Sequence, residues 1–254
     1  MKKGIPFLLT VALLSCYYTT PATNTSLSEG FVRKEYPPQS WAYFLQHLPV
    51  KEAPILDYRG RPIANQAKSA GILSYDVGKR DLQQCADALM RLRAEYLFAQ
   101  GRHEEIAFRF VDGEWFRYKD YVKGRRPRIS GGRVTAGEVE PVPVNHATLR
   151  AYLDIVYAFS STLSLHRDLL PAADFAIGTV IITPGSPGHC SMIVDEISNS
   201  KGEKRYKLVE SFMPAQSIYV LRNEADGSPW HTLQKGIIET ASYRFTKYDL
   251  RRWE

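Results

Sequence analysis

The chain has 254 residues, and its 33 lysines and arginines against 27 aspartates and glutamates give a formal net charge of +6. So small a positive excess over a chain of this length gives no argument for a nucleic-acid partner. No internal repeat is visible, and the chain is long enough for one domain with a substantial hydrophobic core.

The first sixteen residues carry the most specific motif of the sequence. Lys2 and Lys3 precede an apolar run over residues 4–14, which is shorter than the ~20 residues of a membrane span and has the form of a secretion signal. The run ends in Leu-Leu-Ser-Cys16, which resembles the lipobox of bacterial lipoproteins, where cleavage precedes the cysteine and its sulfur is lipidated. An ordinary signal peptide with an incidental cysteine is the alternative. The motif predicts a signal peptide over residues 1–15 and a membrane-lipid anchor at Cys16.

The lipid anchor determines the expected organisation of the rest of the chain. Loss of Lys2 and Lys3 would lower the net charge from +6 to +4. Residues 16–30 are rich in Thr, Ser and Pro, which is typical of a polar tether, and residues 31–254 are predicted to form a single domain. We therefore expect a protein of the bacterial cell envelope, anchored to the outer membrane, with peptidoglycan or another envelope polymer as partner. No metal or cofactor site is predicted.

A helix is predicted from Asp81 to about residue 98, because apolar side chains recur there at steps of three and four. Asp81 and Gln84 have the spacing of a capping box, so the helix should begin at Asp81, with Cys85 in its first turn. A helix terminus favours the thiolate by about 0.3–1 kcal/mol. Lowering a thiol pKa from ~8.5 to about 7 takes roughly 2 kcal/mol, so a reactive Cys85 also needs a cationic partner. The alternative is that Cys85 is an inert core residue.

A strand hairpin is predicted over residues 178–195, with His189 opening its second strand. Alternation along that strand places His189 and Ser191 on one face and Cys190 on the other. If His189 faces the helix, Cys190 does not, which argues against the Cys85–Cys190 disulfide that an oxidising envelope would otherwise favour. We therefore expect Cys85 to be a free thiol.

The remaining elements are expected to complete a mixed domain. Residues 117–133 are basic and contain glycine and proline, which favours a solvated loop over a site for anionic polymers. The other predicted elements are helices at 40–48 and 145–170, strands at 55–58, 71–75, 206–212 and 217–221, and a hairpin pairing 105–110 with 115–118.

The order of a helix opening with Cys85 and a later strand opening with Gly188-His189 resembles papain-like cell-wall hydrolases of the NlpC and CHAP type. The resemblance implies an α+β, papain-like fold. It implies Cys85 as nucleophile, His189 as base and a third residue on the next strand, for which Glu210 and Gln216 are candidates. The backbone N–H of Cys85, with Tyr75 or the Gln84 side chain, would then face the oxyanion.

This sequence departs from the usual motifs of those hydrolases at two places. Gln84-Cys85-Ala86-Asp87 stands where Asp-Cys-Ser-Gly is usual, and Gly178-Thr179 stands where Gly-Asp is usual. Nearly all of the mature chain is also similar to an uncharacterised family of bacterial lipoproteins, domain of unknown function 4846, through segments that include 81–87, 91–96, 187–189, 213–216 and 228–230. That family has no established activity to carry over.

The leading functional hypothesis is hydrolysis of an amide bond in peptidoglycan peptides or a similar envelope substrate. Cys85 would attack, His189 would hold and return the proton, and Glu210 would orient the imidazole. The first alternative is a lipid-anchored module on the same fold that binds glycan or peptide without chemistry. The second is a structural envelope protein with Cys85 in its core.

Overall fold

The computed structural model describes residues 30–130 and 133–254, and it has an α+β architecture. The predicted signal peptide, Cys16 and the tether up to residue 29 lie outside the described residues. The helices are α1 (Trp41–Gln46), α2 (Cys85–Ala99), α3 (Tyr118–Val122), α4 (His146–Phe159) and α5 (Thr162–Asp168), with a 3-10 turn, η1 (His103–Glu105).

The strands of the main sheet run in the order β2-β3-β12-β11-β10-β9-β15-β8, and β1 pairs with β10 outside this path. Each of these pairings is antiparallel. Their bounds are β1 (Phe31–Arg33), β2 (Val50–Lys51), β3 (Ser69–Leu73), β8 (Leu170–Pro171), β9 (Val180–Thr183), β10 (His189–Asn199), β11 (Lys204–Glu210), β12 (Tyr219–Leu221) and β15 (Asp249–Arg252).

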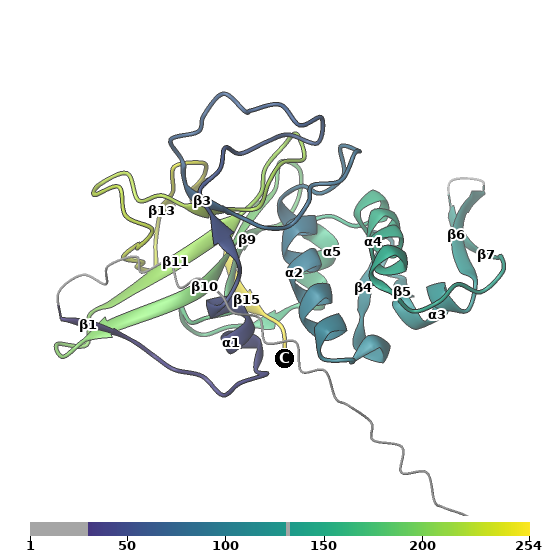
Figure 1. The fold of residues 1–254 in the computed structure, drawn as a ribbon, viewed down its shortest axis with the longest axis horizontal. Helices are drawn as coiled ribbons and strands as arrows, with labels where there is room; N and C mark the ends of the chain where they lie inside the picture. The colour runs from purple at the N-terminus through teal and green to yellow at the C-terminus, as the bar shows by residue number, and fades with distance from the viewer. Residues whose placement is uncertain (1–29, 131–132) are drawn as a thin grey trace, which may run out of the picture.

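Three two-stranded sheets lie apart from the main one. They are formed by β4 (Ala107–Arg109) with β5 (Trp115–Arg117), β6 (Arg125–Ser130) with β7 (Arg133–Glu138), and β13 (Ile238–Glu239) with β14 (Arg244–Phe245). In Figure 1, α2 and α5 lie between the main sheet and α4, and the β6–β7 hairpin lies at the far end from the sheet.

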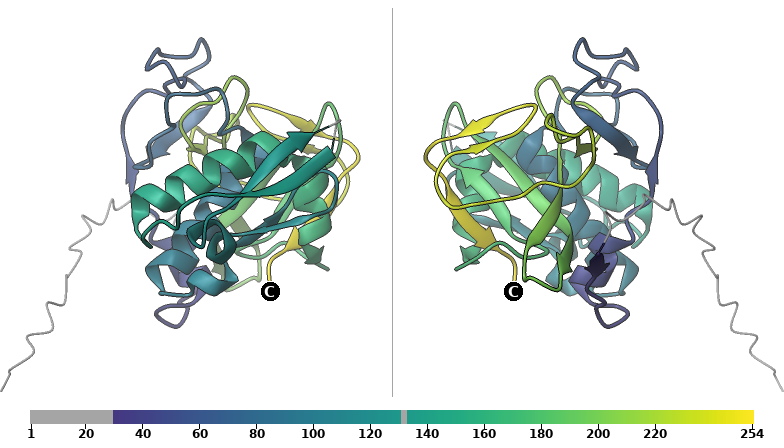
Figure 2. Two further views of the ribbon diagram at one scale, coloured as in Figure 1. Left: turned by 90° about the vertical axis from the view of Figure 1, so that its right-hand side faces the viewer. Right: turned by 90° about the vertical axis from the view of Figure 1, so that its left-hand side faces the viewer.

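Both faces of the main sheet are covered, so β10 is buried from His189 to Ile197 although it carries polar residues among the apolar ones. On one face Cys190, Met192 and Val194 join the larger core cluster with the buried side chains of α2. On the other face Ile193 joins a smaller cluster that includes Ile238 and Phe245, from β13 and β14. Figure 2 shows the helices on one side of the sheet and the C-terminal segment, in yellow, crossing the opposite side.

Helix α2 begins later than the sequence predicts. Its N-cap is Gln84, whose backbone N–H donates to Asp87 Oδ2 at 3.0 Å, so Cys85 is the first helical residue. The predicted start at Asp81 is wrong because the Asp81 carboxylate accepts the backbone N–H of Ala215 at 2.7 Å, a tertiary contact that holds it outside the helix. The prediction of Cys85 in the first turn is confirmed.

Three further expectations are corrected. The helix predicted over 145–170 is divided into α4 and α5, because Ser161 caps α5 through its Oγ, which accepts the N–H of Leu163. Residues 117–133 contain α3 and β6, so they are not a simple loop. Residues 55–58 make isolated bridges only, from Leu56 to Pro62 and from Asp57 to Gln216. The hairpins around residues 112–113 and 184–188 are confirmed.

Within residues 30–130 and 133–254, no helix has both the length and the apolar character needed to cross a bilayer.

Candidate functional site

Three predicted site residues meet where α2 begins against the sheet. Cys85 is the first residue of α2, His189 is the first residue of β10, and Glu210 is the last residue of β11. The ladder pairs Met192 with Val209, so the start of β10 and the end of β11 lie at the same edge of the sheet. His189 and Glu210 are 2 % and 0 % exposed, whereas Cys85 is 9 % exposed. Of the three residues, Cys85 is the most exposed.

The carboxylate of Glu210 binds the His189 ring and is itself fully hydrogen-bonded. Its Oε2 contacts His189 Nε2 at 3.0 Å and accepts the hydroxyl of Ser191 at 2.7 Å. Its Oε1 accepts the hydroxyl of Tyr219, which also contacts Ser242 Oγ at 3.0 Å. Burial alone raises the pKa of Glu210, but the contacts with His189, Tyr219 and Ser191 outweigh burial and lower it. Glu210 is therefore an anion that fixes the ring nitrogen facing it.

The surroundings of His189 are aromatic. Its ring centroid lies 4.7 Å from that of Tyr243, 4.9 Å from that of Phe212 and 5.7 Å from that of Phe245. The buried ammonium of Lys68 lies over the rings of Phe212 and Tyr219, 5.0 and 4.7 Å from their centroids. Burial lowers the pKa of Lys68, and the negative charge of Glu210 acts against that effect.

The environment of Cys85 favours its thiolate. The pKa of Cys85 lies well below its ordinary value, chiefly through a hydrogen-bonding interaction with the Cys190 thiol, while burial acts in the opposite direction. His189 adds a second such interaction and a positive charge, and the backbone N–H of Ala86 adds a third. Because Nε2 of His189 faces Glu210, its Nδ1 is the nitrogen left for the thiol. Burial lowers the pKa of His189, but the contacts with Cys85 and Glu210 raise it to about 9.

The position of Cys190 contradicts the expectation from strand alternation. Cys190 does belong to the opposite face of β10, in the cluster packed against α2. Its thiol nevertheless interacts with the Cys85 sulfur, as does His189 from the other face. Alternation only assigns the side chains of β10 to one face of the sheet or the other. The expectation failed because Cys85 lies beside the very start of β10, where it can contact side chains from both faces. Both cysteines are free thiols in the structure, as expected for Cys85.

A buried carboxyl group completes the first turn of α2. Burial raises the pKa of Asp87 well above its ordinary value, and the neighbouring Cys85 adds to the effect. Both effects disfavour a second negative charge beside the thiolate. Its Oδ1 has no hydrogen-bond partner among the described residues.

The other predicted residues lie in different surroundings. Gln84 is the N-cap residue of α2, and its Nε2 donates to Asp81 Oδ1 at 3.4 Å. Gln216 is buried, and its backbone carbonyl accepts the hydroxyl of Ser211 at 2.9 Å. The guanidinium of Arg91 lies over the Tyr75 ring, 5.4 Å from its centroid, so Tyr75 packs against the side chain of Arg91. Of the two candidates for the third residue, the structure places Glu210 on the His189 ring.

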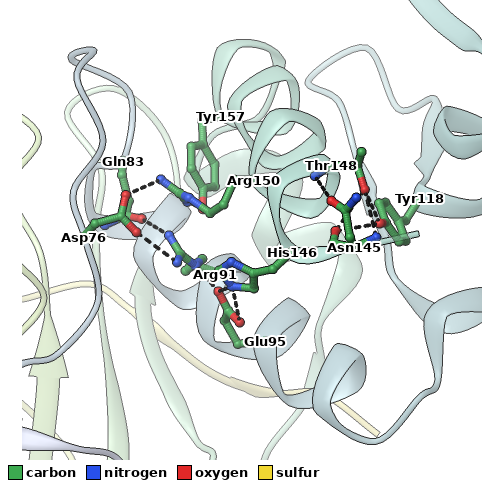
Figure 3. Close-up of polar contacts among 10 residues, drawn as sticks. All are labelled: Asp76, Gln83, Arg91, Glu95, Tyr118, Asn145, His146, Thr148, Arg150 and Tyr157. Carbon is green, nitrogen blue, oxygen red and sulfur yellow. Dashed lines mark hydrogen bonds and ion pairs between the residues drawn. The ribbon is translucent and has the colours of Figure 1, made fainter. Parts of the chain in front are cut away.

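A second buried polar network surrounds Arg91, one and a half turns further along α2 (Figure 3). Arg91 is 1 % exposed, and its Nε contacts Glu95 Oε1 at 2.5 Å. Its two remaining nitrogens donate to Gln83 Oε1 at 3.2 Å and to Asp76 Oδ1 at 3.3 Å. Arg150 of α4 contacts the other oxygen of Asp76 at 3.3 Å. The network joins α2, α4 and the segment that precedes Cys85.

Four of these contacts are not predicted from the sequence: those of Lys68, of Ser191 with Glu210, of Tyr219 with Glu210, and of Cys190 with Cys85. Ser191 was detectable, because it lies two residues after His189 on the same strand face. Lys68 and Tyr219 come from segments whose approach depends on the sheet order, and no local signal marks them. Among the described residues, no group of three His, Cys, Asp or Glu side chains is arranged to hold a metal ion.

Comparison with known families gives a name but no activity. A family model described as a domain of unknown function (4846) matches residues 22–252, so the chain belongs to that family. Neither a curated protein nor a solved structure matches the chain.

Proposed function

Because the chain belongs to a family described only as a domain of unknown function, its function has to be argued from its residues. We propose that the protein is a cysteine hydrolase with a papain-like arrangement, lipid-anchored through Cys16 in the bacterial cell envelope. Its substrate is an amide bond, in a peptidoglycan peptide or a similar envelope polymer.

One observation carries the proposal: the His189 ring lies between the Cys85 thiol and the Glu210 carboxylate. A nucleophile, a base and a residue that orients the base are the three parts that covalent acyl transfer requires. The raised pKa of His189 and the lowered pKa of Cys85 favour a thiolate–imidazolium pair at neutral pH. That pair supplies the activation that the helix terminus alone does not provide.

The chemistry follows from these positions. The Cys85 thiolate attacks the amide carbon, and the developing oxyanion faces the backbone N–H of Cys85, which has no intrahelical partner at the first position of a helix. His189 gives its Nδ1 proton to the leaving amine, which leaves a thioester on Cys85. Water then attacks the thioester while His189 takes its proton, and the carboxylic acid product leaves. Glu210 holds the ring in one tautomer throughout.

The architecture supports the papain-like reading of the site. Helix α2, which begins with Cys85, packs on an antiparallel sheet. The other two residues of the site, His189 and Glu210, come from the adjacent strands β10 and β11. The order along the chain, Cys85 then His189 then Glu210, matches the order in the NlpC and CHAP resemblance. Exposed residues adjoin the site in sequence, namely Ser186 and Pro187 before His189 and Met213 and Pro214 after Phe212.

One observation favours the second candidate, a binding module without chemistry. Cys85 is only 9 % exposed, so little of its side chain is open to an amide that arrives from solvent. A binding module would use the same exposed rim and leave the thiol unused.

The test is incubation of the purified protein with isolated peptidoglycan, followed by mass spectrometry of the released fragments and measurement of new amine groups. Wild type should release amine, and Cys85→Ala and His189→Ala should both abolish the release. His146→Ala, which alters a histidine of the Arg91 network, is the matched control and should retain activity. Equal release by wild type and Cys85→Ala would overturn the hydrolase proposal. Binding of peptidoglycan by both, without release, would establish the binding module.

A further inference from the structure

The second thiol at the site, that of Cys190, takes no covalent part in the proposed amide hydrolysis. Cys190 is 0 % exposed, and its sulfur interacts directly with that of Cys85. The two residues belong to different elements, the first turn of α2 and the second position of β10, which pack against each other in the larger core cluster. Two neighbouring thiols, one slightly exposed and one fully buried, form the arrangement that thiol–disulfide exchange within a protein requires.

We propose that Cys85 and Cys190 form a redox pair in which Cys85 reacts with low-molecular-weight disulfides and Cys190 resolves the product as an intramolecular disulfide. The pair is a modification site distinct from the hydrolytic use of Cys85. A consequence, which rests on the proposed function, is that oxidation removes the nucleophile and switches hydrolysis off reversibly.

The two sulfurs differ in the properties that assign these roles. Cys85 is the more exposed, and its neighbours Cys190, His189 and Ala86 favour the thiolate, which is the attacking form. Cys190 is enclosed, and burial together with the adjacent Cys85 raises its pKa. A disulfide arriving from solvent therefore meets Cys85 first. Cys190 stays protonated until a mixed disulfide removes the negative charge beside it.

The exchange balances in two steps. The Cys85 thiolate attacks one sulfur of the disulfide and forms a mixed disulfide, and the thiolate released takes the proton of the His189 imidazolium. The Cys190 thiol then gives its proton to the neutral His189, and its sulfur attacks Cys85 Sγ, forms the Cys85–Cys190 bond and releases the second thiolate, which takes that proton. The protein loses two electrons and two protons, and the disulfide becomes two thiols. Excess small thiol reverses both steps.

The experiment uses the reduced, full-length, folded protein and glutathione disulfide as the probe. Trypsin separates the cysteines, because Cys16, Cys85 and Cys190 fall in the peptides 4–33, 81–91 and 168–201. In wild type, we expect a transient glutathione adduct on peptide 81–91, followed by a linked pair of peptides 81–91 and 168–201. Dithiothreitol should restore both free thiols.

Two variants assign the roles. In Cys190→Ser the linked pair should be lost and the glutathione adduct on Cys85 should persist. In Cys85→Ser the buried Cys190 should take up no glutathione. The proposal is overturned if wild type keeps its Cys85 adduct as long as Cys190→Ser does, or if Cys85 forms no adduct. These readouts are covalent masses, so they stand whether or not the protein hydrolyses peptidoglycan.

Discussion

Helix α2 carries two buried polar clusters that look alike in composition and differ in what they can do. The Arg91 network consists of charges satisfied by permanent partners, with Glu95 also bound by His146 Nε2 at 2.9 Å. The Cys85 cluster consists of titratable groups, Glu210, His189 and Cys85, of which Cys85 is the most exposed at 9 %. Burial and ion pairing alone therefore do not identify a site. The distinguishing feature is a set of neighbouring groups with shifted pKa values that includes a thiol.

We expect mutations in the two clusters to change different properties of the protein. Removing a charge from the Arg91 network should change the free energy of unfolding, because its members hold each other in place. Removing a group from the Cys85 cluster should change the reactivity of the thiol.

The largest expected effect is that of Arg91→Met on stability. The variant leaves the carboxylate of Glu95 and the amide of Gln83 without their shared partner, in a buried position. Loss of one member of a buried ion pair costs about 3 kcal/mol or more of unfolding free energy. Urea unfolding measures it. Arg91→Met combined with Glu95→Leu should recover most of the loss, since no unpaired carboxylate remains. A single variant as stable as wild type would show that the network carries little energy.

The next effect is that of His189→Gln on the reactivity of Cys85. Without the imidazolium, the pKa of the thiol should rise towards its ordinary value, and alkylation by iodoacetamide near neutral pH should slow about tenfold or more. His146→Gln, in the Arg91 network, should leave the rate unchanged. Alkylation of the unfolded proteins separates ionisation from access. Equal rates for wild type and His189→Gln would show that the Cys–His pair does not form.

The same variant gives a test by pH. The unfolded chain protonates its histidine below about 6.5, whereas the folded pair holds one proton until the lowered pKa of Cys85 is reached. Below about pH 6.5 the unfolded state therefore binds more protons than the folded state does. The contribution of the pair to the free energy of unfolding is lost as pH falls through this range. Between about 6.5 and about 9 both states hold one proton, so the contribution is level. The difference in unfolding free energy between wild type and His189→Gln should follow this course. A difference that instead declines as pH rises from about 6.5 would indicate a protonated thiol.

How far the sequence could predict these clusters depends on the range of the interactions. The helix around Leu89 and the strand opening with His189 were predictable, because periodicity and turn residues are local signals. The start of the helix was missed because Asp81 is held by a contact with Ala215 that only the folded chain brings about. The break after Phe159 was missed because apolar periodicity continues across Ser160 and Ser161 while their capping ends one helix and starts the next.

The predictability of the candidate site follows the same rule. The positions of Cys85 and His189 in their elements were predictable, and Glu210 was one of two candidates. The approach of Cys190 was not predictable, because it depends on how the end of α2 sits over β10. The Arg91–Glu95 pair had a signal in its i, i+4 spacing. Its burial and its contact with Asp76, however, depend on the packing of α4.

The smallest expected effect concerns the outer edge of the Arg91 network. The side chain of Asp76 is 64 % exposed, although it contacts both Arg91 and Arg150. Solvent screens its charge, so Asp76→Asn should lower the unfolding free energy by less than about 1 kcal/mol, and added salt should reduce the difference further. The amide can still accept a hydrogen bond from either arginine, which keeps the segment before Cys85 attached. The alkylation rate of Cys85 should therefore equal that of wild type. A loss comparable to that of Arg91→Met would mean that the bridge between the two arginines, and not the Arg91–Glu95 contact, holds α2 to α4.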